Sequence, residues 1–288
     1  MTTHMLTFDV EEFYQVEAAR RAGVSPQMWA VYDSRLDVGL DSICELLDAA
    51  DVRATFFILG EVARRRGDWV KRLAAAGHEI ASHGMTHTML TQLSPEAAAA
   101  ELRDSKALLE ELSGEAVLGF RAPTFSINHT NAWAIDALAD AGYAYDSSIF
   151  PVRHDRYGVP DAPRGAFRCV GPEGGAVLEI PPLTRRVCGM TMPMGGGGYF
   201  RLVPLWWFAS AIKAAARRND PAMLYFHPWE FDADQPELPG LSGLRRWRHR
   251  VGLAKNAKKL LKLLTKFSFG PVRDQLDGLK QTDVDFTL

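Results

Sequence analysis

The sequence predicts an α/β protein built on a parallel β-sheet. Short apolar runs alternate with amphipathic segments of helical spacing along most of the 288 residues, and short links join them. Such alternation is typical of βα units whose strands lie parallel in one sheet. Six or seven units within about 230 residues fit an α/β barrel better than a small open sheet, and this chain length is ordinary for one barrel domain.

Residue type and spacing predict the individual elements. Residues 54–59 (ATFFIL) form a continuous β-branched and aromatic run, as a buried parallel strand requires. Apolar residues recur at helical spacing over 36–50, and Ser94 followed by Pro95 is a typical helix start. The expected strands are 5–10, 54–59, 79–82, one ending at 120–121, 143–146, 177–180 and 222–226. The expected helices are 36–50, 61–76, 95–112, 131–141 and 204–218.

Two stretches interrupt this alternation. Residues 151–175 are rich in Pro, Gly and Arg, which predicts an inserted loop, and residues 195–198 are four consecutive glycines. The sequence contains no internal repeat and no obvious linker between two separable domains. The expected organisation is therefore a barrel over residues 1–239, with a basic C-terminal helical extension over 240–288 that packs on it.

Composition is ordinary for a folded globular chain, with 47% hydrophobic and 24% charged residues. No apolar run is long enough to predict a membrane span, and the first ten residues lack the basic and apolar regions of a standard signal peptide. The three cysteines are scattered, which suits a reducing compartment. We therefore expect a cytoplasmic location, with the inner-membrane surface as an alternative.

Charge is unevenly distributed along the chain. The formal net charge is −2, yet residues 241–270 contain nine Lys and Arg and no acidic residue. Within this stretch, residues 255–267 (KNAKKLLKLLTKF) predict a basic amphipathic helix. That helix either makes peripheral contact with an anionic membrane or packs its apolar stripe on the barrel. Nucleic-acid binding is not expected, because no known nucleic-acid-binding motif accompanies the basic run.

Polar residues gather where the predicted strands end, which is where α/β folds build active sites. Asp9 and Glu11 share one face of the first strand, where two carboxylates repel unless a cation or an arginine lies between them. His83 and His87 lie four residues apart and can converge on one cation. Two histidines and one carboxylate leave positions open for water and substrate, so they predict a catalytic site for zinc, cobalt, iron, nickel or manganese.

Two further residues each have a structural and a catalytic interpretation. His227 follows an apolar strand and precedes Pro228, so it is either a core histidine or a general acid at the rim of the site. Arg121 is either a structural ion-pair partner or the residue that holds Asp9 ionised as a base.

A longer pattern runs through the chain in the order LTFDVEE (6–12), SHGMTH (82–87), RAPTF (121–125), DSSIFP (146–151) and LYFHPWE (224–230). These five segments resemble the ordered motifs of the polysaccharide deacetylases, the NodB-homology or carbohydrate esterase 4 group. FDVEE, the glycine run, HPWEFD and the basic C-terminal segment are similar to the deacetylases associated with the exosortase/PEP-CTERM exopolysaccharide system. The resemblance implies a distorted (β/α)7 barrel.

The resemblance also implies a metal-dependent N-deacetylase and a role for each motif residue. Asp9 would be the general base, Arg121 would orient it, and His227 would be the general acid. Zn²⁺ is the expected metal, with Co²⁺ and Ni²⁺ as alternatives. The implied metal ligands are Glu11, His83 and His87.

The chain departs from the family pattern at two motifs. Residue 10 is Val where the commonest first motif has a second Asp, so Glu12 remains the rival of Glu11 as carboxylate ligand. Ile149 and Phe150 occupy the last two positions of a motif that often reads DSxDW, which leaves the polar support of His227 open.

The expected activity is the removal of N-acetyl groups from an N-acetylhexosamine-containing exopolysaccharide or its precursor. One alternative is a metal-dependent amidase that acts on a small amide, and another is a non-catalytic glycan-binding protein. The glycan is the expected partner. The expected substrate contacts are Pro123, Phe125, Asp146, Ser147, Tyr199 and Trp229.

Overall fold

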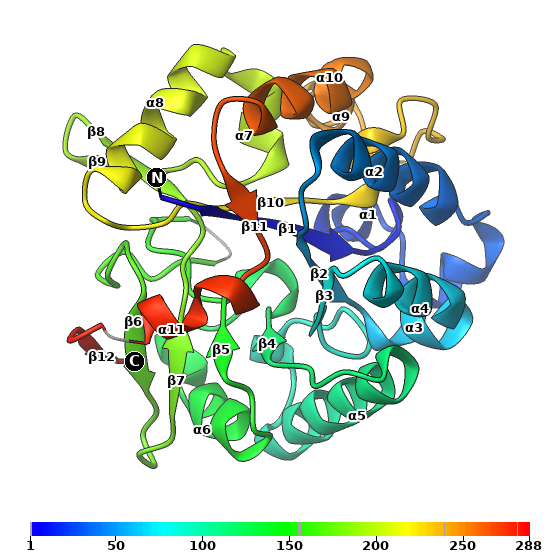
Figure 1. Ribbon diagram of the computed structural model, residues 1–288. Helices are drawn as coiled ribbons and strands as arrows, with labels where there is room; N and C mark the ends of the chain where they lie inside the picture. Colours follow the sequence, from blue (N-terminus) through cyan, green and yellow to red (C-terminus); the bar gives the residue numbers. More distant parts are fainter. Residues whose placement is uncertain (1, 155–156, 239, 281) are drawn as a thin grey trace.

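The computed structural model describes residues 2–154, 157–238, 240–280 and 282–288. Ten strands form one mainly parallel sheet, with most of the helices around its outside (Figure 1). Two further strands form a separate hairpin. The α/β class predicted from the sequence is therefore confirmed.

The helices and strands have the following bounds. The strands are β1 (His4–Val10), β2 (Thr55–Ile58), β3 (Glu79–Ser82), β4 (Gly119–Phe120), β5 (Tyr145–Asp146), β6 (Phe167–Val170), β7 (Ala176–Glu179), β8 (Thr184–Val187), β9 (Met190–Pro193), β10 (Met223–Phe226), β11 (Phe269–Gly270) and β12 (Asp285–Thr287). The α-helices are α1 (Glu17–Arg21), α2 (Leu36–Ala50), α3 (Gly60–Arg65), α4 (Gly67–Ala75), α5 (Pro95–Ser113), α6 (Trp133–Asp140), α7 (Gly197–Leu202), α8 (Leu205–Ala216), α9 (Gly243–Arg250), α10 (Leu253–Leu264) and α11 (Leu276–Leu279). The 3-10 helices are η1 (Pro26–Val31), η2 (Leu90–Gln92), η3 (Pro123–Phe125), η4 (His129–Asn131), η5 (Pro228–Phe231) and η6 (Arg273–Gln275).

The sheet has the order β10-β1-β2-β3-β4-β5-β7-β6-β12, and β11 pairs with β1. Between β7 and β10, the described residues form no strand ladder. Single contacts bridge the gap instead: the Leu183 N–H donates to the Met223 carbonyl at 2.9 Å, and Gly196 forms a parallel bridge with Tyr225. The parallel sheet is consistent with the distorted barrel we expected, but a closed barrel is not confirmed.

The register of the central strands brings the predicted motif residues to one edge of the sheet. Phe8 of β1 pairs with Phe226 of β10, and Ser82 of β3 pairs with Phe120 of β4. The residue that follows each of these positions is a polar motif residue, and parallel strands end at the same edge. The strands themselves are buried and mainly apolar, which fixes this register within the core.

Two predictions about elements are wrong in detail. The expected helix over 61–76 is two helices, α3 and α4, because the backbone leaves helical geometry at Arg66 (φ −133°). The expected loop over 151–175 contains β6, which pairs antiparallel with β7. Only Phe167 and Cys169 of β6 point into the core, so its apolar pattern is too short to stand out among Pro and Gly residues.

The C-terminal segment packs closely on the rest of the protein. Leu260, Leu263 and Leu264 of α10 are buried, and α10 contacts α2 and η5. Beyond it, β11 lies beside β1, and β12 pairs with β6 (Figure 1). Most of the leucines of α10 are therefore buried against the rest of the protein, whereas Leu261 is exposed.

Within the described part of the chain, no helix combines the length and the apolarity that crossing a bilayer requires.

Candidate metal centre and active site

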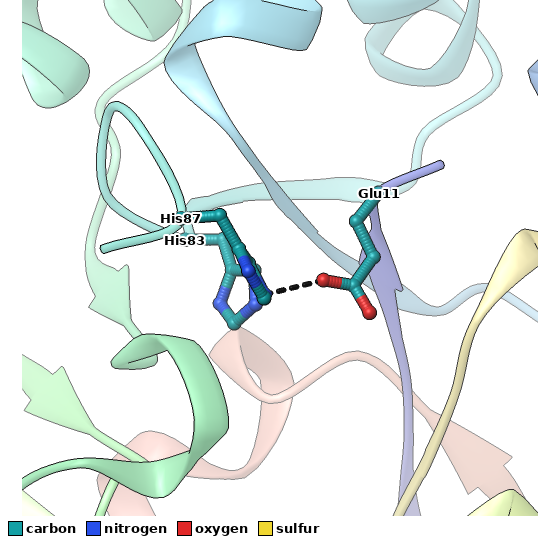
Figure 2. A group of neighbouring side chains, drawn as sticks. All are labelled: Glu11, His83 and His87. Atoms are coloured by element: carbon teal, nitrogen blue, oxygen red, sulfur yellow. Dashed lines mark ion pairs between the residues drawn. The ribbon is translucent and has the colours of Figure 1, made fainter. Parts of the chain in front are cut away.

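Glu11, His83 and His87 form a group in which one ligand atom from each residue lies within 4.8 Å of the others. Glu11 follows β1, and both histidines lie on the loop after β3 (Figure 2). Glu11 Oε2 contacts His87 Nε2 directly. The structure thus brings together the three residues for which the sequence predicts metal ligation.

The loop that carries the two histidines is fixed by its backbone and by one carboxylate. Gly84 (φ 78°) and His87 (φ 56°) both have left-handed backbone conformations, which for histidine is uncommon and often marks a functional site. Glu101 of α5 accepts hydrogen bonds from the backbone N–H groups of Met85 (3.0 Å) and Thr86 (3.3 Å). Glu101 therefore holds the turn between the histidines, a role that sequence reasoning missed.

His83 has the tautomer that a metal ligand needs. Its Nδ1 lies 2.7 Å from the Arg121 carbonyl oxygen, to which only an Nδ1–H can donate. Nε2 is then free to ligate, and such second hydrogen bonds commonly orient histidine ligands. Burial, reinforced by His87, lowers the pKa of His83 to about 3, so the ring stays neutral.

Glu11 also suits a cation. Burial alone would raise its pKa, but the neighbouring histidines, above all His87, lower it. Its Oε2 is buried, and its close contact is with His87 Nε2. A divalent cation between Glu11 and the histidines would compensate this buried negative charge and take the place of that contact. The group therefore fits a metal ion.

Glu12 has a different environment. One of its carboxylate oxygens accepts a hydrogen bond from Ser34 Oγ, and the other accepts one from the Arg35 backbone N–H at 3.2 Å. Burial raises the pKa of this carboxyl. Among the described residues, the structure therefore gathers Glu11 and not Glu12 with the two histidines.

Asp9 lies beside this group and is bound by Arg121. Arg121 Nη1 donates to Asp9 Oδ1 at 2.5 Å and to Thr7 Oγ1 at 2.9 Å. The other guanidinium nitrogens donate to Ser147, and the charged group lies over the Phe57 ring, 4.1 Å from its centroid. Arg121 is fully buried, so it fixes the orientation of the Asp9 carboxylate within the core.

His227 faces both carboxylates. Its Nε2 lies 3.5 Å from Glu11 Oε1 and 3.9 Å from Asp9 Oδ2, while Nδ1 lies 3.1 Å from Glu230 Oε2. Burial opposes protonation of the ring, but Glu230, Glu11 and Asp9 together outweigh it and raise the pKa of His227 to about 9. His227 is thus a cationic side chain whose Nε2 faces both Asp9 and Glu11.

One cavity of about 230 Å³ is lined by Asp9, Glu11, His83, His87 and His227. Phe125 and Trp229 are part of its lining, whereas Pro123 and the fully buried Asp146 and Ser147 are not. Tyr199 lines a neighbouring cavity. The lining consists of Asp9, Glu11, Val16, His83, His87, Ala122, Thr124, Phe125, Tyr157, Tyr225, His227 and Trp229.

Asp146 and Ser147 lie behind the site. Ser147 Oγ accepts a hydrogen bond from Arg121 Nη2 at 3.0 Å, and Asp146 accepts one from Ser148 Oγ at 2.5 Å. Burial raises the pKa of Asp146 to about 6, and burial together with the Asp146 charge raises the pKa of Glu179 well above its usual range. The two carboxyls therefore keep their protons more readily than exposed ones, and they support the strand ends away from the cavity.

Comparison with known proteins identifies the family. The family model described as polysaccharide deacetylase matches residues 24–145. A chitooligosaccharide deacetylase from a Bradyrhizobium strain is 30% identical over 158 residues, which are 51% of this chain and 67% of the relative. The chain belongs to the polysaccharide deacetylase family. The resemblance that the five motifs carry is confirmed.

Other relatives of this polysaccharide deacetylase-family protein align with it over smaller fractions of their own sequences. A peptidoglycan deacetylase-like protein of Gibberella zeae is 33% identical over 39% of this chain and 33% of its own. A chitooligosaccharide deacetylase of Sinorhizobium fredii is 30% identical over 42% of this chain and 55% of its own. The chain thus spans about a third to a half of these curated relatives.

Two solved structures share the fold. A Mycobacterium smegmatis protein assigned to the polysaccharide deacetylases superposes with a TM-score of 0.56 at 19% identity, covering 98% of this chain and 93% of its own. The peptidoglycan deacetylase PdaC of Bacillus subtilis gives a TM-score of 0.52 at 15% identity, covering 97% of this chain and 91% of its own. At these identities the likeness concerns the fold.

The second half of this polysaccharide deacetylase-family protein, residues 147–277, matches a domain of unknown function (DUF3473). This match crosses residue 239, where we expected the barrel to end. It contains His227 and the residues that support it: Arg201 Nε donates to Glu230 Oε1 at 3.0 Å. Sequence reasoning missed Glu230 and Arg201, although the spacing of Glu230 from His227 within one 3-10 turn was a local signal.

Proposed function

We propose that this protein is a metal-dependent hydrolase that removes N-acetyl groups from an N-acetylhexosamine-containing glycan. The observation that carries the proposal is one cavity in which a Glu11–His83–His87 group adjoins Asp9 and His227. Metal ligands, an oriented carboxylate and a protonated imidazole are the parts that amide hydrolysis requires.

The relatives support a glycan as the substrate. Their names specify deacetylases of chitooligosaccharides and peptidoglycan, both of which contain N-acetylated sugars. The cavity presents the aromatic rings of Phe125, Tyr225 and Trp229 near the catalytic groups. Aromatic faces pack well on the apolar faces of sugar rings, which favours a glycan over a small polar amide.

Two histidines and one carboxylate favour zinc as the metal, with cobalt and nickel as substitutes. Bound at Glu11, His83 and His87, a divalent cation supplies Lewis-acid polarisation of the acetyl carbonyl and a more acidic water. The hydrogen bond from His83 to the Arg121 carbonyl links this group to the residue that orients Asp9.

The protein's own groups account for both proton transfers. Asp9, held by Arg121, accepts a proton from the attacking water as the C–O bond forms. His227 donates its Nε2 proton to the sugar nitrogen as the C–N bond breaks. The products are acetate and an amino sugar, and one proton has passed from water to the leaving amine.

The test is acetate release from N-acetylglucosamine oligomers by metal-stripped protein, with zinc, cobalt or nickel added back. We expect restored release in the wild type and none above background from His83→Ala or Asp9→Asn. Asp9→Asn should still bind the metal, which separates the base from the ligands. Restored release that Asp9→Asn leaves unchanged would contradict the mechanism, and release from small acetamides alone would favour the amidase alternative.

A further inference from the structure

A second cavity, of about 390 Å³, lies beside the catalytic cavity and is basic and aromatic. Its cationic side chains come from α1, α7 and α9, and no acidic side chain lines it among the residues that the structure describes. The lining arginines are Arg21, Arg201, Arg245 and Arg248, and the lining rings include Tyr199, Trp229 and His249.

Trp229 connects the two cavities, because its side chain lines both. Its indole stacks on His227, with ring centroids 5.3 Å apart, and on His249, with centroids 4.8 Å apart. A ligand that passes over this indole therefore reaches the catalytic groups at one end and the arginines at the other.

The arginines of this cavity differ in their partners. The Arg201 side chain is buried and is fixed by Glu230 and by the carbonyls of His249 and Val251. Arg245 and Arg248 are exposed and pair with no carboxylate among the described residues.

The neighbouring groups do not neutralise these arginines. Arg246, on the same helix, pairs with Glu237 and lies outside the cavity lining. Burial lowers the pKa of His249 to about 4, so that ring is neutral, and the charge of the cavity comes from its arginines. The surrounding stretch 241–270, with nine basic and no acidic residues, extends the positive field.

Guanidinium groups bind carboxylates and phosphates through paired hydrogen bonds. A concave site with no acidic side chain in its lining favours the binding of such anions over neutral groups. We propose that the Arg245–Arg248 cavity binds an anionic group, a carboxylate or a phosphate, carried by the same N-acetylated molecule that occupies the catalytic cavity. The proposal rests on the proposed function and narrows its substrate to an acidic N-acetylated glycan or a phosphorylated precursor of one.

The test measures binding by calorimetry, which does not depend on turnover. The ligands are a neutral N-acetylglucosamine tetramer, a tetramer of alternating N-acetylglucosamine and glucuronic acid, and UDP-N-acetylglucosamine as the phosphate probe. The proteins are the wild type, the double variant Arg245→Gln/Arg248→Gln, and Arg246→Gln as the matched control.

We expect the double variant to bind one acidic ligand at least about tenfold more weakly than the wild type and the neutral tetramer unchanged, with Arg246→Gln like the wild type. The ligand that responds identifies the source, carboxylate or phosphate. Equal affinity of the wild type and the double variant for both acidic ligands, or equal losses for acidic and neutral ligands, would overturn the proposal. Failure of acetate release with this pattern intact would count against the proposed function alone.

Discussion

His227 makes two contacts with one carboxylate oxygen of Glu230 within one turn of chain. Glu230 Oε2 accepts the backbone N–H of His227 at 3.0 Å and lies 3.1 Å from its Nδ1. This contact keeps the proton on Nδ1 of the neutral ring and points Nε2 at Asp9 and Glu11. A Cβ at Gly197 would lie 2.1 Å from the same carboxylate oxygen, so the glycine run makes room for this pair.

Glu230→Gln should reduce the rate of deacetylation while sparing substrate binding. The amide keeps the size of the side chain but weakens the support of the imidazolium, so we expect kcat to fall by about 10²-fold or more and KM to change little. An aryl acetate, whose leaving group needs no proton, should be affected much less. The matched control is Glu237→Gln, because Glu237 is an exposed acid paired with Arg246. An equal loss on both substrates would indicate a merely structural role.

The pH dependence of His227 follows from its carboxylate neighbours. Its pKa is raised from 6.5 to about 9, so its contribution to the stability of the metal-free protein is complete below pH 6.5 and is lost as the pH rises through 9. NMR titration of the ring in the metal-free protein should give this raised pKa, and Glu230→Gln should lower it. A wild-type ring that titrates near 6.5 would contradict the arrangement. A metal ion bound nearby would add positive charge, so the pKa of His227 should be lower in the metal-loaded protein than in the metal-free protein.

Metal binding should distinguish two adjacent carboxylates. Glu11→Gln should weaken zinc binding by more than about 100-fold, since even supporting residues of metal sites contribute roughly 10–100-fold. Glu12→Gln is the matched control. It should retain wild-type zinc affinity, because the Glu12 carboxylate accepts hydrogen bonds from Ser34 and from the Arg35 backbone instead of facing the two histidines. Competition with a coloured chelator measures both affinities. The opposite ranking would make Glu12 the ligand.

The buried Asp9–Arg121 pair should be costly to break from either side. Arg121→Met leaves the Asp9 carboxylate buried without its cation, and Asp9→Asn leaves a fully buried guanidinium. Each single change should lower the free energy of unfolding by about 3–5 kcal/mol. The double variant should recover much of that stability and remain inactive, as urea unfolding and acetate release would show. Simple addition of the two losses would mean that the residues do not interact.

The positions of the candidate site residues were predictable because they depend on local spacing. His83 and His227 each follow a buried strand, Asp9 lies at the end of β1, and parallel strands bring such residues to one edge of the sheet. The residues that support these groups were not predictable, because their contacts form only in the tertiary structure. Glu230 meets Arg201 at a separation of 29 residues, and Glu101 meets Thr86 at a separation of 15.

Strands with little local signature were missed for a related reason. β11 has only two residues and exists because Phe269 and Gly270 lie along the edge of β1. β12 is mostly exposed, and only Phe286 packs against the core. Neither has the alternation or the apolar run from which strands are predicted.

The apolar stripe of α10 should contribute to folding rather than to a free surface. Leu260 is fully buried, whereas the adjacent Leu261 is 36% exposed. Leu260→Ala should lower the free energy of unfolding by about 2–5 kcal/mol through the cavity it creates. Leu261→Ala is the matched control and should change it by no more than about 0.5 kcal/mol. Chemical denaturation measures both, and a large effect of Leu261→Ala with none of Leu260→Ala would mean that the helix presents its other face to the protein.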